Sequence, residues 1–236
     1  MATTYKTLLA DDITPVRSKL HEAIPVTGSI ISGTYGNNVE LQDNPQNWKF
    51  YSHDMFVSVY DYPYLSSSAN HIFDITVGYS NNSALSSSSN TQNKDKINMY
   101  NQMAQVLVGY DKTGSIQLFD EDGDITAGGA KLTECMFLSF SRLLVKDEIK
   151  KGSFQLELAA SASYTADIFG ERIKITDYGA ATSYKVNSPA GEYGILYVSN
   201  SAGTPLDGIT TPTQQPCGLL YYQAGVAVLN SAILIC

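Results

Sequence analysis

Residues 133–159, TECMFLSFSRLLVKDEIKKGSFQLELA, carry the clearest strand pattern in the chain. Apolar side chains recur at every second position in both halves of this stretch: Met136, Leu138 and Phe140 in the first, and Phe154, Leu156 and Leu158 in the second. A period of two residues is that of a β-strand. The segment between the halves, 146–152, concentrates five charges of both signs, as expected of a solvated turn. The pattern predicts a hairpin, which needs further strands or a helix to be stable.

The composition of the whole chain fits a β-rich protein that is large enough to bury a core. Its 236 residues suffice for one large β domain or two small ones. Charged residues make up only 16% of the chain, below the usual share of about a quarter. Polarity comes instead from Ser, Thr, Asn, Gln and sixteen tyrosines, which suit half-buried sheet faces and subunit contacts.

Net charge, cysteine usage and hydropathy limit the partners, the disulfide content and the location that we expect for the protein. The net charge of −8 argues against binding of nucleic acid, which requires basic residues to neutralise phosphates, and against docking on anionic membranes. Cys135, Cys217 and Cys236 are an odd number without a CxxC motif, so we expect free and mostly buried thiols. We find neither an apolar run of membrane-spanning length nor a secretory signal pattern, and we therefore expect synthesis in a cytoplasm.

Short apolar segments separated by Gly, Pro, Asn and Ser turns recur along the rest of the chain. The predicted strands are 48–60, 71–79, 114–119, 164–168, 172–176, 194–199, 218–222 and 225–229. One helix is expected in the segment 94–108, at about residues 95–108, because the apolar residues of this segment share one helix face and Gly109 follows it. The predicted fold class is mainly β: an antiparallel β-sandwich or a barrel-like domain with one packed α-helix.

The domain organisation follows from the same segments. Residues 1–26 are expected to form an extended arm or a short helix, and the sequence does not decide between the two. Residues 27–236 are expected to form a single β-rich domain, with a subdivision near 80–112 as the alternative. Within that region, 80–93 is rich in Ser and Asn and predicts a surface loop.

Chemical motifs are sparse. Asp120, Asp122 and Asp124 could supply oxygen ligands to Ca²⁺, but the glycine in this segment is misplaced for an EF-hand, so an ordinary Asp-Gly turn is favoured. His21, His53 and His71 are far apart and lack metal-ligand spacing. Nucleophile-elbow, phosphate-loop and dinucleotide motifs are absent from the sequence. We therefore predict no catalytic residues, no metal site, no cofactor and no enzymatic activity.

Two segments resemble virion structural proteins of contractile-tailed bacteriophages, of the kind found in large marine cyanophages. They are FLSFSRLLVKDEIKKGSF at 137–154 and the strands GILYVS and YQAGVAVL within 188–230. The resemblance covers roughly the C-terminal half. It implies a non-enzymatic structural subunit of the tail or baseplate, located in the virion after synthesis in the host cytoplasm. Its partners would be other virion proteins and copies of itself.

Two further functions stay open at this point: a head or neck structural protein, and a carbohydrate- or receptor-binding module of a tail appendage. A glycan partner would be expected to stack on tyrosines, if Tyr60, Tyr62 and Tyr64 form one exposed patch. These tyrosines are interface candidates, as are Ile233, Leu234 and Ile235 near the C-terminus. The latter three are expected to add a strand to a neighbour or to complete the protein's own sheet.

Overall fold

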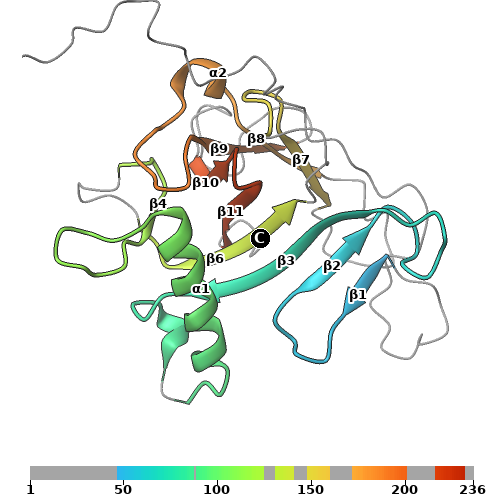
Figure 1. Ribbon diagram of the computed structural model, residues 1–236, viewed down its shortest axis with the longest axis horizontal. Helices are drawn as coiled ribbons and strands as arrows, with labels where there is room; N and C mark the ends of the chain where they lie inside the picture. The colour runs from blue at the N-terminus through green and yellow to red at the C-terminus, as the bar shows by residue number, and fades with distance from the viewer. Residues whose placement is uncertain are drawn as a thin grey trace, which may run out of the picture.

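The computed structural model describes residues 47–87, 89–124, 131–140, 148–159, 172–200 and 216–231. Within them, a nine-stranded antiparallel sheet has the order β1-β2-β3-β6-β11-β10-β9-β8-β7 (Figure 1). Its strands are β1 (Trp48–Phe50), β2 (Val57–Tyr60), β3 (His71–Tyr79), β6 (Glu134–Phe140), β7 (Gln155–Ala159), β8 (Arg172–Thr176), β9 (Tyr193–Asn200), β10 (Pro216–Tyr221) and β11 (Val226–Asn230). The expected mainly-β class is confirmed.

Helices and a small second sheet complete the described part. The one long helix is α1 (Asn93–Leu107), which confirms the predicted helix to within two residues at its start and one at its end. Short elements are the 3-10 turn η2 (Ala84–Ser86) and α2 (Ala180–Ser183). Strands β4 (Phe119–Asp120) and β5 (Lys131–Leu132) pair with each other only.

Two predicted strands are shorter in the structure than in the sequence pattern. The segment 48–60 was expected as one strand but forms β1 and β2, because residues 51–56 make a hairpin loop in which Asp54 adopts the left-handed region at φ 51°. The segment 114–119 becomes strand only at Phe119, after an isolated bridge between Ile116 and Tyr110. The arm at 1–26, the strand at 164–168 and the C-terminal candidates Ile233, Leu234 and Ile235 lie outside the described residues.

The predicted hairpin of 133–159 is wrong in its pairing, although both of its strands exist. Both edges of β6 are already occupied, by β3 on one side and β11 on the other, and β7 pairs with β8 at the far end of the sheet. The two strands nevertheless meet through side chains, since the rings of Phe140 and Phe154 lie 5.5 Å apart in an edge-to-face contact. The sheet therefore curls until its β7 end approaches β6.

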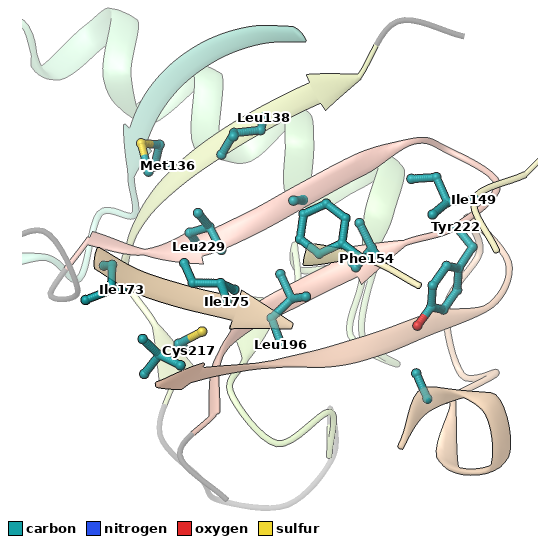
Figure 2. Close-up of a cluster of buried hydrophobic side chains, with 14 residues drawn as sticks. Met136, Leu138, Ile149, Phe154, Ile173, Ile175, Leu196, Cys217, Tyr222 and Leu229 are labelled. Carbon is teal, nitrogen blue, oxygen red and sulfur yellow. The ribbon is translucent and has the colours of Figure 1, made fainter. Parts of the chain in front are cut away.

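A first core fills the inside of this curl (Figure 2). Strands from β6 through β11, β10, β9 and β8 each contribute inward side chains, and Phe154 enters from the segment before β7. The labelled members are Met136, Leu138, Ile149, Phe154, Ile173, Ile175, Leu196, Cys217, Tyr222 and Leu229. Because these side chains come from strands far apart in the sequence, their burial drives the curl of the sheet.

A second core lies between the other face of the sheet and helix α1. Tyr100 of α1 packs edge-to-face on Phe119 and Phe137, with ring centroids 5.5 and 6.4 Å away. The helix approaches β3 so closely that a Cβ atom at Gly78 would lie 2.8 Å from the backbone nitrogen of Tyr100. Glycine at position 78 is therefore required for this packing, since any larger residue would push the helix away.

A buried carboxylate fixes the chain just before β7. Asp177 accepts hydrogen bonds from the backbone N–H groups of Gly152 (2.6 Å) and Phe154 (3.0 Å) and from the hydroxyl of Tyr222 (3.1 Å). Burial raises the pKa of Asp177, and these hydrogen bonds offset the effect in part. The three bonds hold the turn at 150–153 in register with the first core, so that Phe154 points into it.

Replacing Tyr100 by phenylalanine tests the second core. The buried Tyr100 hydroxyl donates to the carbonyl of Leu132 (2.6 Å) and accepts from the N–H of Phe119 (3.3 Å), so Tyr100→Phe removes two buried hydrogen bonds and leaves the Leu132 carbonyl with the weaker bond from the Cys135 thiol (3.7 Å). We expect the free energy of unfolding, measured by urea titration, to fall by about 1–3 kcal/mol. The matched Tyr110→Phe change at an exposed position should leave it within about 0.5 kcal/mol of wild type.

Alkaline pH is expected to destabilise the protein through its buried tyrosines. Burial raises the pKa of Tyr193 from 10.0 to about 12, and it also raises the pKa values of Tyr100, Tyr221 and Tyr222. Between pH 10 and 12 the unfolded chain therefore loses a proton that folded Tyr193 keeps. Because the folded state then binds more protons, the free energy of unfolding falls as pH rises, by about 1.4 kcal/mol per pH unit for each such tyrosine.

Urea titrations across this pH range measure that slope. Tyr193→Phe should lower stability at neutral pH but make the alkaline decline shallower by about 1.4 kcal/mol per pH unit. Tyr178→Phe, at an exposed position, should leave the slope unchanged. An equal slope in wild type and Tyr193→Phe would contradict the assignment.

Candidate functional site on strands β1 to β3

Strands β1 and β2 extend the sheet beyond both cores, and the first half of β3, whose Phe73 and Ile75 pack against the first core, joins them to the rest of the sheet. No residue of β1 or β2 belongs to either cluster of buried side chains in the described part of the chain. These strands project from the body of the molecule (Figure 1). We call them the ribbon. Directly paired residues in antiparallel strands point to the same face, so the register assigns each ribbon side chain to one of two faces.

One face of the ribbon is entirely apolar. Its cross-strand rows are Trp48–Val59–Phe73 and Phe50–Val57–Ile75, followed by Val77. The rows continue into β6, where Phe73 pairs with Phe140 and Ile75 with Leu138, and the rings of Phe73 and Phe140 lie 5.9 Å apart. The apolar face is therefore a continuation of the first core onto a projecting part of the sheet.

Much of this apolar face is accessible. Phe50 is 67% exposed and Val77 is 46% exposed, and the other members of the face are only half-buried. The indole Nε1 of Trp48 is buried and has no hydrogen-bond partner within the described residues. A partner packed on the face would remove its apolar surface from water.

The opposite face carries polar and aromatic groups. Asp74 lies at its centre, where its Oδ1 accepts a hydrogen bond from the hydroxyl of Ser58 (2.5 Å) and contacts Nε2 of His71 (2.8 Å). The hydroxyl of Tyr51 lies 3.2 Å from Ser58 Oγ, and the ammonium of Lys49 lies 4.7 Å from the centre of the Tyr51 ring. This polar face is a hydrogen-bonded network built from all three strands.

The trio of Ser58, Asp74 and His71 resembles a hydrolytic triad in composition but not in order. In a Ser–His–Asp triad the histidine lies between the other two and takes the proton of the serine. Here Ser58 and His71 both bind the same oxygen of Asp74, so the carboxylate lies between them. His71 therefore cannot take the Ser58 proton in this arrangement, and the network holds the strands in register.

The tyrosine candidates are brought together in part. The rings of Tyr60 and Tyr64 lie 6.3 Å apart, and the Tyr60 ring also contacts that of His71 at 5.5 Å. Burial raises the pKa of Tyr60, with smaller contributions from Tyr51 and Asp74. All three candidates, including Tyr62, are half-buried, so they do not form the fully exposed patch that a glycan platform requires.

The aspartate cluster lies in a turn that follows β4. Asp120 is buried and pairs with the ammonium of Lys131, while its Oδ1 accepts the N–H of Asp122 at 3.2 Å. Asp122 in turn accepts the N–H of Asp124 at 2.9 Å. Burial raises the pKa of Asp120, the neighbouring Asp122 adds to this, and Lys131 opposes it. Across the ranges that the structure describes, no three His, Cys, Asp or Glu side chains are grouped to hold a metal ion.

The two faces of the ribbon were missed at the level of sequence, although a signal was present. The segments 48–50, 57–60 and 73–77 alternate apolar and polar residues, and only their pairing shows that the apolar positions coincide. Comparison with protein-family models, curated proteins and solved structures finds no match to this chain. In the described residues, no helix is both long enough and apolar enough to cross a membrane.

The polar network predicts a stabilising role for Asp74. Asp74→Asn removes the charge that strengthens two hydrogen bonds, one of them to the buried Ser58 hydroxyl, so we expect the free energy of unfolding to fall by about 1–2 kcal/mol. The control is Asp54→Asn, which removes the same charge from an exposed residue, and asparagine also tolerates the left-handed backbone there. Equal losses in thermal or urea unfolding would contradict this role.

Proposed function

We propose that the protein is a non-enzymatic structural subunit of a bacteriophage virion, in its tail or baseplate, which assembles through the apolar face of the ribbon. The observation that carries the proposal is this face: a projecting sheet surface without a charged side chain, which includes the 67% exposed Phe50. Contiguous apolar surface of this kind is typical of protein–protein contacts.

The occupant that fits the apolar face best is the same face of a second copy. Two such faces can pack on each other because both are uncharged and built from β-branched and aromatic residues. Sheets pack face to face at about 10 Å, and a two-fold contact uses one patch twice. The contact would extend the first core of each copy through Phe73 and Ile75, which already pack against that core.

The place in a virion rests on the resemblance of 137–154 and 188–230 to structural proteins of contractile-tailed phages. Those segments contain the second half of β6 and all of β9, β10 and β11, strands that are neighbours in the sheet. Particle subunits combine a rigid β body with surfaces that other subunits cover. The central strands provide such a body here, and the ribbon provides such a surface.

Self-association can be tested by measuring the mass of the purified protein by sedimentation or light scattering. We expect an oligomer at micromolar concentration. Phe50→Glu places a charge in the contact and should weaken association about a hundredfold or more, because an unpaired buried charge costs about 3 kcal/mol or more. Leu65→Glu, at a residue that is 77% exposed outside the face, should leave the mass unchanged.

A wild-type monomer, or an equal effect of both glutamate variants, would overturn assembly through this face. Mass spectrometry of purified particles tests the virion assignment separately. The protein is expected among the constituents of particles whose genome encodes it, and its absence from them would overturn that assignment.

A further inference from the structure

A cleft of about 410 Å³ lies between the hairpin loop 51–56 and helix α1, next to strand β3. Its walls are the loop, the β3 residues Thr76 and Val77, and one side of the helix from Gln92 to Gln102. The volume is within the range of small-molecule sites, about 300–1,000 Å³. Val77 of the apolar face also lines the cleft, whereas Phe50, the residue whose replacement tests assembly, does not.

The loop wall is held rigidly. The ring of His53 stacks on Tyr51, with centroids 5.2 Å apart and planes 5° from parallel, and also contacts Phe56 at 4.9 Å. The N–H of Met55 donates to His53 Nδ1 (3.1 Å), so the neutral ring carries its proton on Nε2. The hydroxyl of Thr76 donates to the carbonyl of Met55 (2.5 Å) and ties the loop to β3.

The helix wall is fixed from behind. Tyr100, Ala104 and Leu107 bury the other side of α1 in the second core, and the close approach at Gly78 sets its distance from β3. The residues of α1 and its N-cap that line the cleft recur at helical spacing, and all of them except Met99 are polar. They are Gln92, Asp95, Lys96, Asn98, Met99 and Gln102. Both walls are therefore set before any ligand arrives, which lowers the entropic cost of binding.

We propose that this cleft binds a saccharide. Three side-chain amides, those of Gln92, Asn98 and Gln102, line it, and each offers both a donor and an acceptor. Sugar hydroxyls are likewise both donors and acceptors, so amides can bind neighbouring hydroxyl groups in pairs. The methionines Met55 and Met99 supply apolar contact for the C–H face of a sugar ring.

Charge selects against the other small ligands that such a cleft could admit. Two carboxylates, Asp54 and Asp95, line it against one ammonium, Lys96, and the whole chain carries −8. An anionic ligand such as a phosphate ester is therefore repelled. A compact cation would leave the three amides without a role, whereas an uncharged polyol uses amides and carboxylates together. This binding goes beyond the assembly function and does not depend on it.

Binding is tested with the full chain by glycan array and by ligand-observed NMR with glucose, galactose, N-acetylglucosamine and their disaccharides. We expect at least one saccharide to bind. Gln102→Ala should weaken it about three- to tenfold, the equivalent of one or two lost hydrogen bonds. Gln105→Ala is the matched control, since Gln105 is an exposed glutamine of the same helix that does not line the cleft. Alanine favours helix at both positions, so both variants should fold.

Three results would overturn the proposal. They are the failure of every saccharide to bind, binding that Gln102→Ala and Gln105→Ala weaken equally, and binding of spermidine or of a glucose phosphate in preference to neutral sugars. The mass measurement with Phe50→Glu is independent of these results, so failure of saccharide binding and failure of assembly are distinguishable.

Discussion

Burial of the central strands on both faces is the constraint on which the rest of the structure depends. In β6 the consecutive residues 135–138 are all buried, and in β11 the same holds for 226–229. Such strands need apolar cover above and below. The curl of the sheet provides the cover on one side, where the first core forms, and α1 with β4 provides it on the other. The close contact at Gly78 and the ring contact of Phe140 with Phe154 both follow from this need.

The ribbon differs from the central strands because only one of its faces is apolar. Its polar face is joined by the hydrogen bonds of Asp74, and its hairpin loop forms one wall of the cleft. The apolar face is the surface through which we propose that copies of the protein associate. The two proposed activities therefore use different residues of the same strands, apart from Val77, which belongs to both sites.

Local patterns in the sequence predicted most elements but not their neighbours. The strands at 71–79 and 172–176 and the helix at 94–108 follow from alternation, helical spacing and a terminal glycine, which are local signals. The pairing of β6 with β3 and β11 was missed, because a charged turn between two strands suggests a hairpin whether or not one forms. The sequence did offer one signal for a central strand: Cys135 and Phe137, on the second face of β6, are apolar, and both are buried in the structure.

The place of β11 in the sheet has a consequence for how the protein is made. This strand is the last of those described, yet it lies between β6 and β10, near the middle of the sheet. Until β11 has left the ribosome, β6 has an open edge and both cores lack side chains from Ala227 to Leu229. The centre of the sheet therefore cannot close before β11 has been made, and until then the nascent chain exposes an apolar strand edge that needs protection from aggregation, for instance by chaperones.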